Sequence, residues 1–487
     1  MIAKSVAPAK GERLNKDPPK GKSMLTINSG DHHSRRAFLK IGALGMGGLT
    51  LSQLLAASSS AAESRRVVTG KSVIFLHMHG GPSQFETFDP KMTAPVGIRS
   101  VTGETQTSVP GVTFGATFPK LARLADKLSV VRSYVPAYDH SASPIINRET
   151  QNANVGSYYG RVVGLNHPTT GIPTNMLLTP QAVFSDALPL AGPGANTFGQ
   201  TGSLGNAYAP VMPGAGGNML RNMQLTVPRE RLDDRRTVLA GLDSLRREMD
   251  NTGTMETMDR YRDQAFDVIM RGVGRAFDLS QEDPRVVASY DTAPLLNVEM
   301  IRRNLGNYRL YIDHARSIGK QLLLARRLCE AGCGFVTVVT NFVWDMHADG
   351  NNAPPSEALP YVGNPFDHAV SAFIQDLESR GLSDDILLVC CGEMGRTPRV
   401  NQGGGRDHWP SLGPLLLSGG GLRMGQVVGR SEADGGRPAS DPVTLQNLYA
   451  TIMNTLFDVG QVRLMRGLGS DVIRMITDGQ PIAQLMA

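Results

Sequence analysis

Cysteine is scarce in this 487-residue chain, and its four copies, Cys329, Cys333, Cys390 and Cys391, all lie in the second half. A disulfide framework needs paired cysteines spread along a chain, so this distribution excludes one. Cys329 and Cys333 have a spacing that could bind a metal ion, but no matching second pair accompanies them. Cys390 and Cys391 lie inside an apolar run. Buried thiols are the favoured interpretation, and a single disulfide is the alternative.

Apolar runs long enough to cross a bilayer are also lacking. A spanning helix needs about 20 apolar residues, whereas the apolar run at residues 41–55 is shorter and contains four glycines. Small residues follow it at 56–62, with no cysteine to carry a lipid anchor. The sequence therefore predicts no transmembrane anchor and a soluble or peripheral mature protein.

That apolar run directly follows the segment SRRAFLK at residues 34–40. A paired arginine, an apolar pair and a lysine before a short apolar run have the order of a twin-arginine export signal. A buried amphipathic helix is the alternative, but it leaves the glycines and the small-residue end unexplained. We expect cleavage near Ala62, export of the folded protein by the twin-arginine translocase, and a periplasmic or extracellular location.

Without this leader the chain has no excess of basic residues that would predict nucleic-acid binding. Residues 1–62 hold nine Lys and Arg against three Asp and Glu, so this segment has a net charge of +6. The whole chain has a formal net charge of +5, so residues 63–487 have a net charge near −1. Nucleic acid is therefore not an expected partner. The Lys-, Pro- and Gly-rich residues before Ser34 are typical of a disordered extension.

Residues 63–487 are enough for one large α/β domain with insertions or for two smaller domains. Continuous apolar runs at 72–76, 130–131, 335–339 and 386–391 predict strands buried on both faces. Helical apolar spacing precedes the last two, at 321–329 and 366–377. This alternation predicts a three-layer α/β/α sandwich around a mainly parallel sheet.

Residues from about 150 to 300 have a different composition. A Gly-, Pro- and Asn-rich stretch at 168–217 precedes a strongly charged helical stretch at 229–271. We expect an inserted helical and loop cap over the sheet, although charged helices of this kind are also typical of plain solvated surface.

Polar residues follow each predicted strand, where parallel α/β sheets bind their ligands. The strand ends are followed by His77, His79 and Asp89; by Asp139, His140 and Ser141; by Asp345 and His347; by Glu393 and Arg396; and then by Arg406, Asp407 and His408. Any one of these histidines could be structural, but together they predict a site for a divalent ion, Zn²⁺, Mn²⁺, Mg²⁺ or Ca²⁺.

The densest of these segments are 392–398 and 403–409, where glycines allow the backbone to approach a bound ion. Arg396 and Arg406 carry planar guanidinium groups that match phosphate, sulfate or carboxylate oxygens, so we predict that they bind an anion. A structural loop whose arginines and carboxylates pair with each other is the alternative.

These segments resemble those of domain-of-unknown-function family 1501, a family of exported bacterial proteins. The resemblance is carried by GGPS at 80–83, TFDPK at 87–91, LARRL at 324–328, WDMH at 344–347, GEMGRTP at 392–398 and GRDHW at 405–409. It covers nearly all of the chain after the leader. The family in turn is similar to the alkaline phosphatase and sulfatase superfamily, which implies an α/β/α sandwich and hydrolysis of a phosphate or sulfate ester.

The resemblance also implies metal ligands. Asp345 and His347 match the spaced Asp and His of that superfamily, Glu393 matches its late Asp, and Asp407 with His408 match its final His. The superfamily's aspartate after the first strand falls near His79, and its second late histidine is replaced by Met394.

A nucleophile is predicted beside His140, at Ser141, Ser143 or Thr150, with Ser141 and His140 as the catalytic pair. A formylglycine sulfatase is not expected, because no cysteine precedes Cys329.

Two functions follow from the sequence. The first is an exported metal-dependent hydrolase of phosphate or sulfate esters, small or polysaccharide. The second is a phosphatase-like protein that has lost part of its catalytic set and binds anionic polysaccharide or serves in cell-surface assembly; Met394 favours it.

Overall fold

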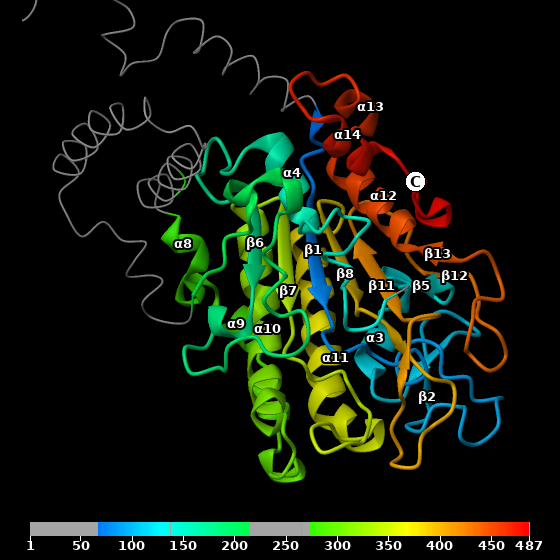
Figure 1. Ribbon diagram of the computed structural model, residues 1–487. Helices are drawn as coiled ribbons and strands as arrows, with labels where there is room; N and C mark the ends of the chain where they lie inside the picture. Colours follow the sequence, from blue (N-terminus) through cyan, green and yellow to red (C-terminus); the bar gives the residue numbers. More distant parts are fainter. Residues whose placement is uncertain (1–66, 137, 215–263, 265–272, 487) are drawn as a thin grey trace, which may run out of the picture. The chain divides into compact units, whose positions relative to one another are not determined.

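The central sheet forms from the short apolar runs of the chain, because strands buried on both faces need apolar side chains in both directions. The computed structural model describes residues 67–136, 138–214, 264 and 273–486. Within them the sheet has seven strands in the order β12-β4-β11-β8-β1-β7-β6. They are β1 (Ser72–His77), β4 (Ser129–Val131), β6 (Asn175–Leu178), β7 (Phe335–Val339), β8 (Ile386–Cys391), β11 (Leu415–Gly419) and β12 (Gln426–Val428). Figure 1 shows β6, β7, β1, β8 and β11 side by side.

The sheet is mainly parallel, as predicted. β1 pairs in parallel with β7 and β8, and His77 at its end is in register with Val339 and Cys391. Only β11 runs antiparallel to its neighbours in this sheet of the described chain. The three central strands therefore end at the same level, and β11 begins where they end.

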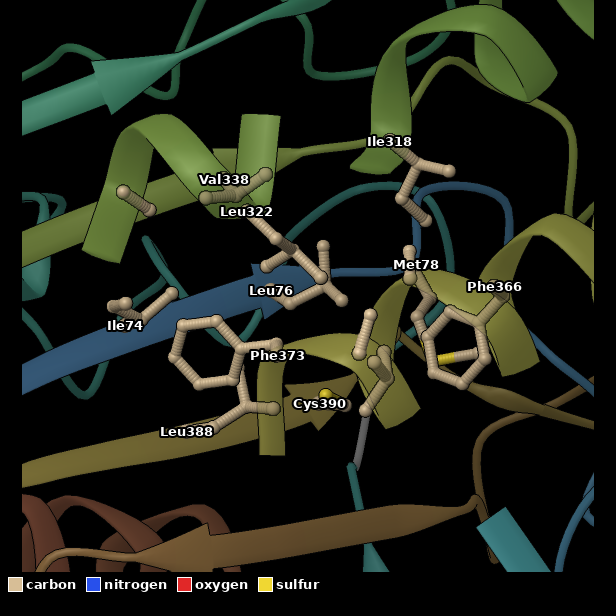
Figure 2. Close-up of a cluster of buried hydrophobic side chains, with 14 of the residues drawn as sticks. Ile74, Leu76, Met78, Ile318, Leu322, Val338, Phe366, Phe373, Leu388 and Cys390 are labelled. Atoms are coloured by element: carbon tan, nitrogen blue, oxygen red, sulfur yellow. The ribbon is translucent and has the colours of Figure 1, made fainter. Parts of the chain in front are cut away.

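One face of the sheet is covered by the long helices α10 (Tyr308–Glu330) and α11 (Pro355–Arg380). Alternate residues of β1, Ile74 and Leu76, point into this layer, where they pack with Leu322 of α10 and Phe373 of α11 (Figure 2). Because α11 connects β7 to β8, its beginning lies near the end of β7. This layer fixes the loop between β7 and α11.

The opposite face carries α4 (Val155–Val163), α12 (Leu445–Leu456) and α14 (Ser470–Thr477). The other alternate residues of β1, Val73 and Phe75, pack here, with Tyr158 of α4 and Leu448 of α12. Two apolar cores on either side of one sheet confirm the predicted three-layer α/β/α sandwich.

The remaining described elements are short. Three two-stranded sheets pair β9 (Gly395–Arg396) with β10 (His408–Trp409), β5 (Tyr134–Val135) with β13 (Val443–Thr444), and β2 (Glu104–Gln106) with β3 (Thr113–Gly115). The short helices are α3 (Pro119–Arg123), α8 (Gly274–Phe277), α9 (Pro284–Ser289) and α13 (Val459–Val462). The 3-10 turns are Ala125–Lys127, Pro180–Ala182, Gly202–Leu204, Asn206–Tyr208, Leu279–Gln281, Ala293–Leu295, Val298–Met300 and Ala483–Leu485.

The region expected to be an inserted cap is partly built into the sandwich. Residues 155–163 form α4 on one face, and residues 175–178 form the edge strand β6, parallel to β7. The leader with its twin-arginine segment lies outside the described residues, as do all but residue 264 of the charged stretch at 229–271. None of the described helices combines the length and apolar character needed to cross a bilayer.

Candidate metal centre

Four side chains meet at the end of the central strands: His140, Asp345, His347 and His408. Each offers one ligand atom, and these four atoms all lie within 4.8 Å of one another. The Oδ1 atom of Asp345 is 2.8 Å from Nε2 of His347, 3.3 Å from Nε2 of His408 and 3.4 Å from Nε2 of His140. Three imidazoles thus surround a single carboxylate oxygen.

Different segments deliver these four residues. Asp345 and His347 lie in the loop after β7, and His140 follows β5. His408 lies on β10, opposite Arg396 of β9, and the chain then enters β11. Because β11 is antiparallel, the segment before it lies at the same edge as the ends of β1, β7 and β8.

A close backbone contact holds the Asp345 loop against the end of β1. Gly80 has a φ of 116°, and a Cβ atom on it would lie only 2.6 Å from the backbone nitrogen of Asp345. Only glycine permits this approach. Trp344, which is 1% exposed, anchors the same loop in the core by packing edge-on against Phe366 of α11.

Asp345 is held as a carboxylate. Burial by itself would raise its pKa, but the surrounding histidines and the Arg396 guanidinium together hold that pKa well below the ordinary value. Nη2 of Arg396 lies 2.5 Å from Oδ1, and Asn352 donates to Oδ2 at 3.3 Å. The cluster therefore contains a fixed negative charge.

His347 is oriented from its far side. Its Nδ1–H donates to Oδ1 of Asp407 at 3.4 Å, and Asn401 donates both to that carboxylate and to the backbone oxygen of His347. Asp407 thus contacts the ring nitrogen opposite the cluster, an arrangement common around metal-binding histidines. The predicted direct metal ligand Asp407 is outside the group of four in this geometry.

His140 is oriented in the same way by Glu393. The Nδ1–H of His140 donates to Oε1 of Glu393 at 2.7 Å, which leaves its Nε2 facing the cluster without a hydrogen-bond partner. Burial alone would lower the pKa of His140, but the adjacent carboxylates of Asp345 and Glu393 raise it to about 9. Burial alone would raise the pKa of Glu393, which His140 instead lowers to about 2.

The predicted catalytic pair is not formed. Both ring nitrogens of His140 face carboxylates, so neither is available to the Ser141 hydroxyl. Ser141 is exposed, and its backbone N–H donates to Asp139. Sequence reasoning identified His140 as a site residue but gave it the wrong neighbours, because the spatial neighbours of a loop residue depend on how the strands are ordered.

A cavity of about 280 Å³ adjoins the cluster. His140 and Glu393 form part of its wall, together with His77, His79 and Phe198. The rings of His77 and His79 pack edge-on against Phe198. The rest of the lining comes from single residues between positions 138 and 152 and between positions 193 and 200, including Tyr138, Ser141, Asn147, Arg148, Asn152 and Gln200.

His77 and His79 are buried with unused nitrogens. Neither ring nitrogen of His77 has a hydrogen-bond partner in the described structure, and Nδ1 of His79 has none either, while its Nε2 lies 2.9 Å from the carbonyl oxygen of Pro193. Burial lowers the pKa of His77 to about 3 and also lowers that of His79, so both rings are neutral. Nε2 of His77 is 3.6 Å from Glu393. These nitrogens are available to a ligand in the cavity.

The two predicted anion-binding arginines are buried in the fold. All the N–H groups of Arg406 have acceptors within the chain, which are Glu86 and the backbone oxygens of Ile98, Arg99, Thr397 and Pro398. Arg396 bonds Asp345 and the backbone oxygens of Gly80, Gly81 and Arg406. Both guanidinium groups therefore hold loops together, and the prediction that they bind a free anion does not fit their contacts.

Comparison with known proteins places the chain in one family. Residues 70–486 match the model of a family described as a protein of unknown function, DUF1501. No curated protein matches the chain.

Solved structures show weak likenesses. A sulfatase from Pseudoalteromonas sp. is 11% identical with a TM-score of 0.33, over 83% of this chain and 71% of that one. A phosphonate monoester hydrolase from Silicibacter pomeroyi has the same identity and TM-score, over 79% and 73%. The TAB5 alkaline phosphatase is 10% identical with a TM-score of 0.24, over 72% and 91%. At such TM-scores these likenesses assign no function to the chain.

Proposed function

The chain belongs to the DUF1501 family of unknown function, and we propose that it is a metal-dependent hydrolase of phosphate or sulfate esters. The observation that carries this proposal is the convergence of His140, Asp345, His347 and His408 beside a polar cavity at the ligand-binding edge of the sheet. The substrate class follows from the sequence resemblance, and the cluster supplies the means for its chemistry.

The donor set fits a divalent ion. Three imidazoles and one carboxylate are ligands that Zn²⁺ and related ions use, and two Zn–N bonds of about 2.0–2.1 Å at a tetrahedral angle place their nitrogens roughly 3.3 Å apart. The distances from Asp345 Oδ1 to the three Nε2 atoms lie between 2.8 and 3.4 Å. Asp407 and Glu393 take up the Nδ1–H groups of His347 and His140, so the Nε2 atoms of both rings face the position of an ion. Because the pKa of His140 is raised to about 9, an ion bound there would displace the proton on its Nε2.

A divalent ion held by these residues would supply Lewis acidity toward an ester oxygen. The residues around it have separate tasks. Asp345 contributes a carboxylate that stays ionised, and Arg396 holds it in place. Glu393 keeps the His140 ring in one orientation.

The cavity histidine His77 supports an ester oxygen as ligand. A neutral imidazole carries one N–H, so His77 can donate a hydrogen bond into the cavity, whereas His79 donates its N–H to the Pro193 oxygen and can only accept there through Nδ1. The ionised Glu393 beside them repels an anion. We therefore expect an anionic ester to bind only when the cation is present. That Glu393 and His79 are themselves metal ligands stays a prediction.

The export route is part of the same proposal. The segment at 34–40 and the apolar run after it support passage through the twin-arginine translocase. Replacing Arg35 and Arg36 together by lysine should retain the unprocessed chain in the cytoplasm. Export of that double variant at the unmodified rate would contradict this route.

A screen of aryl phosphates and aryl sulfates tests the proposed reaction. Protein purified without chelator should hydrolyse at least one class when supplied with Zn²⁺, Mn²⁺, Mg²⁺ or Ca²⁺ in turn, and His347→Ala should abolish that activity. His167→Ala, a partly exposed histidine in the segment before β6, is the matched control. Metal bound without any turnover on the panel would favour a binding protein instead.

A further inference from the structure

A second and larger groove lies along α11, apart from the metal centre. Its volume is about 760 Å³, within the range of small-molecule sites. It runs between α3, α9 and the second half of α11. Basic side chains from all three helices line it, namely Lys120, Arg123, Arg285 and His368.

The acidic residues of this groove already have cationic partners. Asp283 pairs with Arg285 at 2.7 Å. Asp376 pairs with Arg326 at 3.1 Å and with Arg380 at 2.7 Å. The carboxylates of the groove therefore do not neutralise its other basic residues.

Lys120 and Arg123 have no carboxylate within ion-pair distance in the described part of the chain. The Lys120 ammonium donates to Nδ1 of His368, whose Nε2–H donates to the backbone oxygen of Ser289 at 2.8 Å. An imidazole that accepts at Nδ1 and donates at Nε2 is neutral. The nearby carboxylate Asp367 is buried and accepts two backbone N–H groups of α3, and burial raises its pKa to about 6.

One residue that lines the same groove has an unpartnered hydroxyl. Ser371 on α11 is 3% exposed, and its Oγ has no hydrogen-bond partner. A buried hydroxyl without a partner is unfavourable unless a ligand completes it. Ser371 lines the groove that also holds Lys120 and Arg123.

We propose that this groove binds an oxyanion, a phosphate or sulfate group, through Lys120, Arg123 and the Ser371 hydroxyl. The ammonium and guanidinium supply charge-assisted donors, and the hydroxyl supplies a neutral one. Because the groove holds much more than a single such group, the anion is carried on a larger molecule. The site is independent of the metal centre and of the reaction proposed there.

Calorimetric titration of the full chain with inorganic phosphate, inorganic sulfate and a sulfated hexasaccharide tests the site. We expect one site per chain that survives in His347→Ala, so that it is separable from any anion site at the metal centre. Lys120→Met with Arg123→Gln should weaken it at least tenfold. Tighter binding of the hexasaccharide than of free sulfate would show that the ligand is a sulfate group attached to a larger molecule. Equal binding would show that the ligand is the free ion.

Two further variants keep the test specific. Lys127→Met removes the same charge from a lysine paired with Glu378 at 2.5 Å outside the groove, and it should change the affinity by less than twofold. Ser371→Ala should weaken binding without lowering the melting temperature, because the hydroxyl makes no bond in the free protein. The absence of a site in unmodified protein, or equal weakening by Lys127→Met, would overturn the proposal.

Discussion

The Nε2 atom of His347 lies 2.8 Å from the Nε2 atom of His408, and both nitrogens also face Oδ1 of Asp345. A hydrogen bond between two imidazole nitrogens needs one of them to be unprotonated. The Nδ1–H of His347 already donates to Asp407, so its Nε2 carries a lone pair while the ring is neutral. A cation bound among these atoms would interact favourably with Nε2 of His347, Nε2 of His408 and Oδ1 of Asp345 at the same time.

Asp407 should tune metal affinity without being a ligand. Asp407→Asn weakens the carboxylate that orients His347, and loss of such a partner typically costs 10–100-fold in metal affinity. We expect that loss with the metal stoichiometry unchanged at saturating ion, measured by competition with a fluorescent chelator. Asp441→Asn, also an exposed aspartate, is the control. A lower stoichiometry in Asp407→Asn would instead make Asp407 a direct ligand.

Alanine substitutions of His140 and of its neighbour Ser141 should have different effects on metal binding. His140→Ala removes one of the four converging ligand atoms and should weaken metal binding by more than about tenfold. Ser141→Ala removes an exposed hydroxyl that His140 does not contact, so metal affinity should stay within about twofold of the unmodified protein. A large loss of hydrolysis with normal metal binding in Ser141→Ala would restore it as the nucleophile.

Gly405 should be intolerant of any side chain. A Cβ atom there would lie 2.1 Å from the backbone oxygen of His347, so Gly405→Ala must displace the residue that supplies one ligand. We expect weaker metal binding and a lower melting temperature. Gly350→Ala is the control, because a Cβ atom on Gly350 meets nothing within 4 Å. Equal metal affinity in the two variants would show that His347 tolerates the displacement.

Local sequence pattern predicted the central strands well. The predicted strands at 335–339 and 386–391 have the bounds of β7 and β8, because their side chains are apolar on both faces. The place of Asp345 and His347 at the site was also predictable, since parallel strands end at one edge. His408 reaches the same edge for a different reason, because it precedes the antiparallel strand β11. The edge strand β6 was missed because it lies in a Gly- and Pro-rich region without a strong apolar run.

The roles of the arginines and of His140 were not predictable from pattern. The acceptors of Arg406 come from Glu86 and the backbone at residues 98–99 and 397–398, and only the folded chain brings these segments together. Spacing along the sequence could not show that His140 would lie between Asp345 and Glu393. The twin-arginine leader lies outside the described residues and stays a prediction.

An ion-pair network that joins Glu282, just before α9, to arginines of α10 and α11 should control acid stability. Burial alone would raise the pKa of Glu282, but its bonds to Arg326, Arg327 and Arg380 lower it from 4.5 to about 2. A depressed carboxyl pKa stabilises the fold above the unfolded value, and this contribution disappears as the pH falls through the folded value. Arg326 is 1% exposed, so its buried positive charge requires the carboxylates that pair with it, among them that of Glu282.

Glu282→Gln should therefore lower the free energy of unfolding by about 1–3 kcal/mol at pH 7. The difference from the unmodified protein should close as the pH falls from about 4.5 to about 2. Urea unfolding at several pH values measures it, with the exposed Glu299→Gln as control. A difference that is constant with pH would exclude Glu282 as the titrating group.

Metal content measured by mass spectrometry on chelator-free protein is the most direct test of the central claim. The unmodified chain should hold at least one divalent ion, and a His347→Ala, His408→Ala double variant that retains its fold by circular dichroism should hold none at the four-residue cluster. An unmodified protein with less than one ion per chain after incubation with each candidate metal, or a double variant with the same metal content, would contradict it.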